Sequence, residues 1–209
     1  MNQQVRRDCV RPSILAWTVA ALLGLSTAAP AGAACQALGA GRYHCASTGN
    51  PGADGAALRT FIEGRTFPCG STIILDAGAE YHSILSGGYY YPPVNLKPQA
   101  GCSGQQKTQI VSSRLADLPL GRRVSWDERS KMARLVGVGA PTETGLAVSF
   151  NEKGVNNYAF RGIAFTTGPG IAGANTTDYL VAFRYEPSDT DSLDSYPRNI
   201  EFDRCAFFP

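Results

Sequence analysis

The sequence has few of the residues from which metal centres and charged binding surfaces are built. It contains only two histidines, His44 and His82, and its six cysteines include no Cys-x-x-Cys pair. These features exclude the common structural zinc patterns, which need closely spaced cysteines or histidines. Neither histidine has a paired nucleophile or carboxylate pattern in the sequence, so neither is a strong catalytic candidate.

A long apolar run is also missing. The apolar stretch over residues 14–25 has about a dozen residues, fewer than the roughly 20 that a helix needs to cross a bilayer. It follows three arginines and precedes Ala31-Gly32-Ala33, the order of a secretory signal peptide. We therefore predict a signal peptide over residues 1–33, a secreted, periplasmic or cell-surface location, and no stable membrane span in the mature chain. A retained N-terminal anchor is the alternative.

Charge of one sign is scarce once this segment is set aside. The whole chain has 19 basic and 17 acidic residues and a net charge of +2. The first 33 residues hold three arginines and one aspartate, so 16 residues of each sign remain. No basic field is left to attract nucleic acid or anionic lipid, and we expect no nucleic-acid partner.

Five cysteines remain after cleavage: Cys35, Cys45, Cys69, Cys102 and Cys205. Export to an oxidising compartment favours disulfides over metal ligation. We expect the pairs Cys35–Cys45 and Cys69–Cys102, with Cys205 as a buried free thiol.

The composition favours a single domain rich in turns. The chain has 209 residues with 23 glycines and 13 prolines, which suits an all-β fold better than a helical one. An irregular lead-in is expected over residues 34–55. A helix is expected over residues 56–68, where Leu58, Phe61 and Ile62 share one face. Short strands are expected at residues 72–75, 108–112, 133–137 and 145–150.

An internal repeat gives the most specific structural signal. Residues 157–165 and 199–207 carry apolar side chains at the second, fourth, seventh and ninth places of both copies, at an offset of 42 residues. This pattern predicts two strands that meet at a bend in each copy. Copies stacked in parallel would place Phe160 beside Phe202 and Asn157 beside Asn199.

Several short motifs occur in the order found in one family of proteins. They are Cys69–Gly78, Gly101-Cys102, Ile110–Ser113, Leu118-Pro119, Gly121–Val124, Met132–Val136, Phe160–Phe165 and Phe202–Cys205. Together they resemble secreted bacterial right-handed parallel β-helix proteins with a pectate-lyase-like fold. The resemblance implies an all-β solenoid, with a short helix that caps its N-terminal end and its first coils over residues 69–209. The chain ends inside a predicted strand, so we expect a fragment that is incomplete at its C-terminus and lacks the active coils.

Two groups of residues are candidates for ligand contact. Tyr89, Tyr90 and Tyr91 offer flat apolar rings with polar tips that suit stacking on sugars. Their alternative role is packing over neighbouring coils. Asp189, Asp191 and Asp194 offer the oxygen ligands that calcium prefers, and the resemblance implies that calcium would bridge substrate uronates. The alternative is a solvated acidic loop.

The sequence leaves open whether the protein is an enzyme. One hypothesis is a polysaccharide lyase or glycoside hydrolase, which needs calcium with a basic residue, or two flanking carboxylates. The mixed charges over residues 114–131 are one place for such a base, although this pattern is typical of a solvated surface. The second hypothesis is a non-catalytic extracellular protein that binds glycan or acts as a scaffold.

Overall fold

A computed structural model describes residues 35–139, 145–168, 180–183 and 192–208. The expected signal peptide lies outside the described residues. The described strands are β1 Cys35–Gly39, β2 Arg42–Cys45, β3 Thr72–Leu75, β4 Glu80–His82, β5 Ile84–Ser86, β6 Tyr89–Tyr91, β7 Val94–Asn95, β8 Thr108–Ser112, β9 Ala133–Gly137, β10 Val148–Ser149, β11 Asn156–Arg161, β12 Ile163–Thr167, β13 Val181–Ala182, β14 Arg198–Asp203 and β15 Ala206–Phe208. The helices are α1 Pro51–Glu63 and the short 3₁₀ segments η1 Leu115–Asp117, η2 Trp126–Lys131 and η3 Leu193–Ser195.

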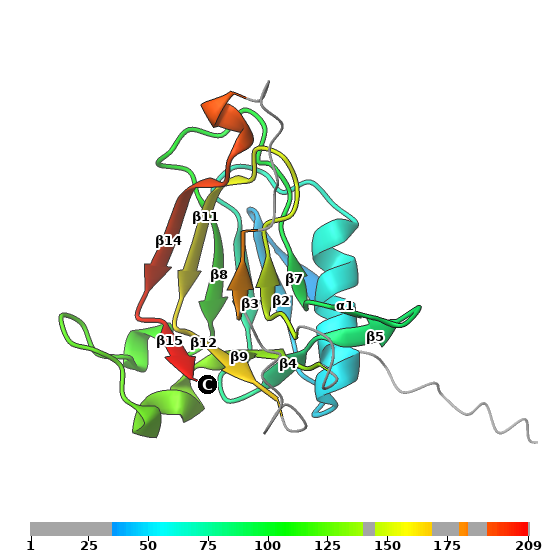
Figure 1. Ribbon diagram of the computed structural model, residues 1–209. Coiled ribbons are helices and arrows are strands. Elements are labelled where there is room, and N and C mark those ends of the chain that lie inside the picture. The colour runs from blue at the N-terminus through cyan, green and yellow to red at the C-terminus, as the bar shows by residue number, and fades with distance from the viewer. Residues whose placement is uncertain (1–34, 140–144, 169–179, 184–191, 209) are drawn as a thin grey trace, which may run out of the picture. The chain divides into compact units, whose positions relative to one another are not determined.

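The strands form four sheets of unequal size. Six strands pair in the order β1-β2-β3-β8-β11-β14, four in the order β15-β12-β9-β4, three in the order β13-β10-β7, and β5 pairs with β6. Figure 1 shows β3, β8, β11 and β14 side by side, and β9, β12 and β15 beside them. The two larger sheets are parallel except for the antiparallel β1–β2 pair, while β5 and β6 are antiparallel.

The expected fold class, an all-β right-handed parallel β-helix, is wrong for this structure. The described strands lie in several small sheets, some parallel and one mixed, and a 13-residue helix packs into the same core. Two antiparallel pairs interrupt the parallel order, because tight glycine turns reverse the chain at Gly41 and at Gly87-Gly88. The helix contributes to the core, since its Leu58 and Ile62 are almost fully buried there.

The register predicted for the internal repeat is confirmed. Strand β11 pairs in parallel with β14, with Phe160 opposite Phe202, and β12 pairs with β15, with Phe165 opposite Phe207. The rings of Phe160 and Phe202 are stacked with their centroids 5.3 Å apart. Apolar side chains thus continue from strand to strand in the same register, buried on β11 and β12 and more exposed at Phe202 and Phe207 on the outer strands.

Asn157 and Asn199 occupy equivalent corners in the two copies. Both have left-handed backbone conformations, with φ of 60° and 54°, which asparagine tolerates better than most residues. The Asn199 Nδ2 donates to Asn157 Oδ1 at 2.5 Å, and the Asn157 Nδ2 donates to the Cys102 carbonyl at 2.9 Å. The predicted asparagine pair is therefore present and connects the repeat to the loop before β8.

Helix α1 begins at Pro51, five residues before the expected start, and ends at Glu63. Asn50 caps it by accepting from the Ala53 backbone N–H, and proline suits the first turn because it lacks an N–H. The carboxylate of Asp54 is buried in this first turn. It accepts hydrogen bonds from the Ser47 and Thr48 hydroxyls, both at 2.6 Å, and these bonds compensate its burial.

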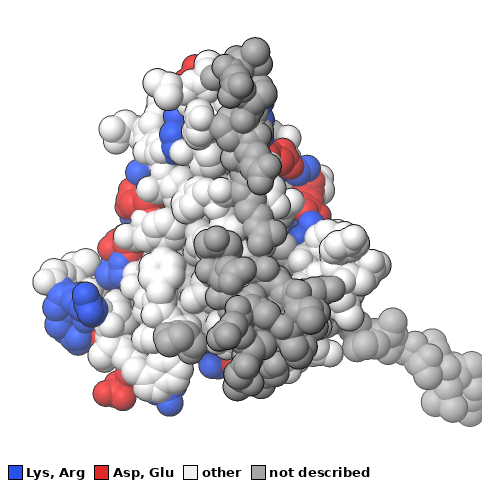
Figure 2. Space-filling model, in the orientation of Figure 1, with Lys and Arg blue, Asp and Glu red and all other residues white. Residues whose placement is uncertain are grey.

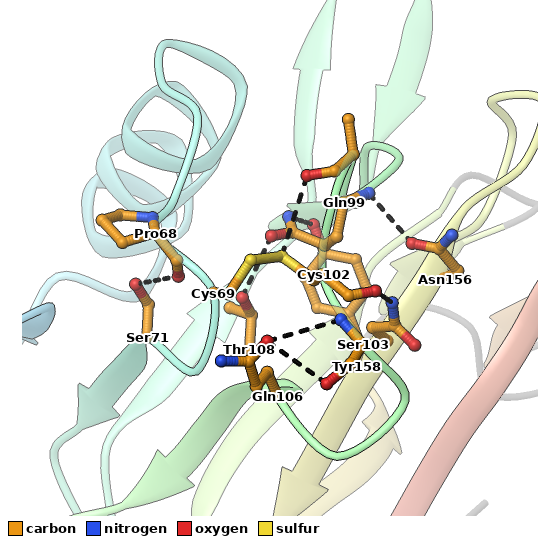
Figure 3. Close-up of a disulfide and its surroundings, with 12 residues drawn as sticks. Pro68, Cys69, Ser71, Gln99, Cys102, Ser103, Gln106, Thr108, Asn156 and Tyr158 are labelled. Carbon is orange, nitrogen blue, oxygen red and sulfur yellow. Dashed lines mark hydrogen bonds between the residues drawn. A yellow bond between two sulfur atoms is a disulfide. The ribbon is translucent and has the colours of Figure 1, made fainter.

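Two disulfides join Cys35 to Cys45 and Cys69 to Cys102. The second ties the chain before β3 to the loop before β8, beside a buried polar network (Figure 3). In that network Gln99 donates to the Tyr158 hydroxyl at 2.5 Å and accepts from Thr108. Burial raises the pKa of Tyr158 to about 12.

Cys205 is a free, partly buried thiol that packs against the core. Its Sγ donates to the Phe160 carbonyl at 3.3 Å, and burial raises its pKa to about 12. We expect no reaction with a thiol reagent at pH 8 in the folded protein and rapid reaction in denaturant. The unfolded thiol ionises near its ordinary pKa. The contribution of the neutral thiol to the free energy of unfolding should therefore be complete below about pH 8.5 and should be lost as the pH rises toward 12. A Cys205→Ser variant, which has no thiol at this position, is the control for background labelling. Fast labelling of the native protein would contradict the shielding of Cys205 described above.

Candidate functional site

The three candidate tyrosines form one strand of an exposed hairpin. Strands β5 and β6 pair only with each other, and Leu85 lies opposite Tyr90. The two connecting residues, Gly87 and Gly88, both have positive φ, of 58° and 84°. This conformation suits glycine and gives the tight turn that matches the twist of a hairpin.

The alternation of a strand separates the tyrosine side chains. Tyr89 and Tyr91 project to one face of the hairpin and Tyr90 to the other, since side chains alternate along a strand. Tyr89 is the most accessible, with 70% of its surface exposed, while Tyr90 and Tyr91 are half-buried. Tyr89 is therefore the ring with the largest free surface for a ligand.

Arg59 of helix α1 fixes the base of the hairpin. Its guanidinium lies 4.6 Å from the centre of the Tyr91 ring, and its Nη1 donates to the Pro92 carbonyl at 3.0 Å. Its Nη2 forms an ion pair with Glu63 at 2.5 Å, one helical turn further along α1. A single arginine thus holds the tyrosine strand, the chain after it and the helix together.

The orientation of Asn95 is determined by the same network. Its Nδ2 donates to Glu63 Oε1 at 2.8 Å. A carboxylate only accepts, so the amide nitrogen faces Glu63 and the Oδ1 faces away. This Oδ1 is buried and has no hydrogen-bond partner among the described residues. A buried acceptor without a donor is uncommon in native proteins.

These residues line a cavity of about 440 Å³ beside the hairpin. Its lining residues are Arg59, Tyr89, Tyr90, Tyr91, Pro92, Asn95, Leu146 and Asn151. The lining is aromatic and apolar with a few carboxamide and hydroxyl groups, which is the usual character of a small-ligand site. Among the described residues that line it, none is aspartate, glutamate or histidine. The cavity therefore offers stacking and hydrogen bonding rather than carboxylate or imidazole chemistry.

A second, smaller cavity of about 230 Å³ lies on the sheet of β4, β9, β12 and β15. Glu80 is its one acidic lining residue, and it pairs with Arg134 at 2.6 Å and with His82 at 2.8 Å. Glycoside hydrolysis needs two carboxyl groups about the bond that is cut, and this cavity supplies one. Both oxygens of Glu80 are already bonded, so the group serves to join neighbouring strands.

The remaining candidate residues do not converge on either cavity. His44 bonds to Asp76 at 2.7 Å, and Asp194 pairs with Arg198. Asp189 and Asp191 lie outside the described residues, so the expected calcium loop stays a prediction. Among the residues that the structure describes, no group of three or more histidine, cysteine, aspartate or glutamate side chains is placed to hold a metal.

The mixed charges of residues 114–131 form ion pairs within the connection. Arg114 pairs with Asp117 at 2.6 Å, and Arg122 pairs with Glu128 at 2.8 Å. Glu128 also accepts from the Ser125 backbone N–H at the start of η2, and this bond lowers its pKa. These ion pairs are those of a solvated surface, and the residues lie outside the tyrosine cavity. Arg122 and Arg123 line a third cavity, of about 470 Å³, beside Phe202 and Phe207.

The comparisons with protein-family models, curated proteins and solved structures found no match. Within the described part of the chain, no helix has the length and apolar character needed to cross a membrane. A functional inference for this protein therefore rests on the chemistry of its own sites. Among the cavities formed by the described residues, the tyrosine cavity is the one lined by three aromatic side chains.

Proposed function

We propose that this protein binds carbohydrate outside the cytoplasm, at the cavity beside the β5–β6 hairpin. The observation that carries the proposal is the exposed ring of Tyr89, which lines the cavity together with Tyr91 on the same face of the hairpin. A sugar ring has one apolar face of C–H groups and an edge of hydroxyls. Aromatic rings bury the apolar face, and amides and phenolic hydroxyls bond the edge.

The positioning of the tyrosines also supports a binding role. An exposed aromatic strand without a fixed base would lose much of its binding energy to the cost of ordering it. Here Arg59 holds Tyr91 and Pro92 on the rigid helix α1, and the turn at Gly87-Gly88 fixes the register of the hairpin. The platform is thus ordered before a ligand arrives.

The cavity supports binding more than cleavage. General acid–base catalysis needs a titratable group within hydrogen-bond reach of the reacting bond, and a lyase needs a base beside an acidic sugar. The Arg59 guanidinium in the cavity is already bonded to Glu63 and Pro92, and no carboxylate lines the cavity among the residues that the structure describes. The lyase or hydrolase hypothesis stays a prediction, and the non-catalytic glycan binder is the function that this geometry favours.

The two disulfides are consistent with the proposed extracytoplasmic location. Disulfides persist in oxidising compartments and are rare where thiols are kept reduced. Together they join four of the five cysteines that follow the predicted signal peptide.

Replacing Tyr89 by alanine should weaken the binding of a recognised oligosaccharide by roughly tenfold, because the stacking ring is lost. Tyr89→Phe should retain most of the affinity, since the ring remains. Isothermal titration with a panel of soluble plant and bacterial oligosaccharides, neutral and acidic, measures both effects. Tyr196→Ala is the matched control, because Tyr196 is also exposed and does not line the cavity. Failure of every oligosaccharide to bind, or equal binding by Tyr89→Ala, would contradict the proposal.

A further inference from the structure

We infer that the tyrosine cavity takes an uncharged carbohydrate and discriminates against uronic-acid chains. The inference rests on the proposed function and adds the class of ligand. It follows from the charges of the groups that line the cavity. A lyase would require an acidic substrate, which is the class of sugar that this cavity should bind less well.

Among the described residues that line the cavity, Arg59 is the one charged side chain, and both terminal nitrogens of its guanidinium already bond to groups of the protein. One terminal nitrogen donates to the Pro92 carbonyl and the other pairs with Glu63, while the face of the guanidinium covers Tyr91. The side chain is 14% exposed. Arg59 is therefore a positioning residue for the hairpin, and its charge is neutralised by Glu63 before any ligand binds.

A ligand carboxylate would meet an unfavourable environment here. Glu63 lies 2.5 Å from the Arg59 guanidinium, so a carboxylate that approached the same cation would also approach Glu63. Like charges at such a separation repel, and removing an uncompensated carboxylate from water is costly. The negative charge of Glu63 thus opposes the attraction that Arg59 would otherwise exert on an anionic sugar.

Hydroxyl groups match the other polar atoms of the cavity. Asn95 lines the cavity, and its buried Oδ1 is an acceptor without a donor among the described residues, so a ligand group that came to lie against it would have to be a donor. A hydroxyl supplies one, whereas an ionised carboxylate only accepts. The tyrosine hydroxyls and the Asn151 amide can both donate and accept, as sugar hydroxyls do.

The surface around the hairpin has the same uncharged character. The hairpin lies at the right of Figure 1, next to α1, and the corresponding surface in Figure 2 is white. Elsewhere on this face blue and red side chains are interspersed, with one compact blue group at the lower left. On the face that Figure 2 shows, the described residues next to the hairpin form no extended field of one sign that would steer an anionic polymer toward it.

The experiment compares one neutral oligosaccharide with its C6-oxidised form, in which each primary alcohol has become a carboxylate. We expect the mature protein to bind the oxidised form at least about tenfold more weakly, as the burial of an unpaired charge predicts. Binding of the neutral form should change little between about 50 and about 500 mM salt, since no ion pair is formed. Titration calorimetry at both salt concentrations gives the affinities.

A Glu63→Gln variant tests the origin of the discrimination. It removes the negative charge beside Arg59 and keeps an oxygen that can accept from it. The affinity gap between the two sugars should narrow, and binding of the oxidised form should become salt-dependent. Equal or tighter binding of the oxidised form by the unaltered protein would overturn the inference and leave the proposed function standing. An unchanged gap in Glu63→Gln would overturn the role given to the Arg59–Glu63 pair. Binding of neither sugar class would overturn the proposed function itself.

Discussion

Replacing Phe160 by alanine is expected to lower the free energy of unfolding by about 3–5 kcal/mol. Phe160 is fully buried in the main core, and its ring lies 5.5 Å from that of Phe165 and 5.3 Å from that of Phe202, between centroids. Removing the ring leaves a cavity among groups that are held by parallel strands on either side, so the site cannot easily collapse. Urea denaturation of the unaltered and variant proteins measures the difference.

Phe202→Ala provides the comparison for this prediction. Phe202 stacks on Phe160 in the same register but is 37% exposed, so its truncation removes less buried surface. We expect a loss of roughly half that of Phe160→Ala, because stabilisation scales with the apolar area removed from water. A larger loss at Phe202 than at Phe160 would contradict the packing described for β11 and β14.

Removing the Cys69–Cys102 disulfide should lower the free energy of unfolding by about 3–4 kcal/mol, because the unfolded chain gains conformational entropy when a loop of this length is opened. The two cysteines are 33 residues apart, and the loop between them contains both strands of the tyrosine hairpin. The double variant Cys69→Ser/Cys102→Ser avoids leaving an unpaired thiol. Its thermal and urea transitions, compared with those of the unaltered protein, give the loss.

The second disulfide is the control for this measurement. Cys35 and Cys45 are 10 residues apart and close a short hairpin, so opening that loop should cost about 1 kcal/mol less. Peptide mapping without reduction should recover both pairs and leave Cys205 alkylatable only after unfolding. A disulfide that includes Cys205 would contradict the placement of β15.

Local patterns in the sequence were sufficient to predict the bounds of several strands and the register in which the two copies of the repeat pair. The predicted strands at residues 72–75, 108–112 and 133–137 have the bounds of β3, β8 and β9. Each is a short β-branched or aliphatic run next to a turn, and its partners repeat the same pattern of apolar residues. The matching positions of phenylalanine and asparagine in the two copies of the repeat then fixed the pairing of β11 with β14.

The prediction of an all-β solenoid was wrong because it extended one local pattern, that of the internal repeat, to the whole chain. The antiparallel pairing of β1 with β2 follows from a turn at Gly41 and a short-range disulfide, neither of which the repeat contains. The start of α1 was missed because residues 51–55 include proline and two glycines, which disfavour a helix interior. The Asn50 cap and the bonds from Ser47 and Thr48 to Asp54 offset that preference.

The candidate site was only partly visible in the sequence. The three adjacent tyrosines identified the hairpin, and Asn95 follows them closely in the chain, but Arg59, Leu146 and Asn151 come from distant segments. The spacing of Arg59 and Glu63 by four residues does predict a helical ion pair. It does not predict that the guanidinium contacts Tyr91, since this contact depends on how the chain returns to α1 after the hairpin.

The most direct test of the proposed function is a crystal structure of the mature protein bound to a neutral oligosaccharide. A sugar ring should lie on the exposed face of Tyr89 in van der Waals contact, at about 4 Å between heavy atoms. Arg59 should remain paired with Glu63 in that complex, as it is in the free protein. A sugar bound at the Glu80–Arg134 cavity, or a bound sugar that leaves the Tyr89 ring uncovered, would contradict the assignment of the site.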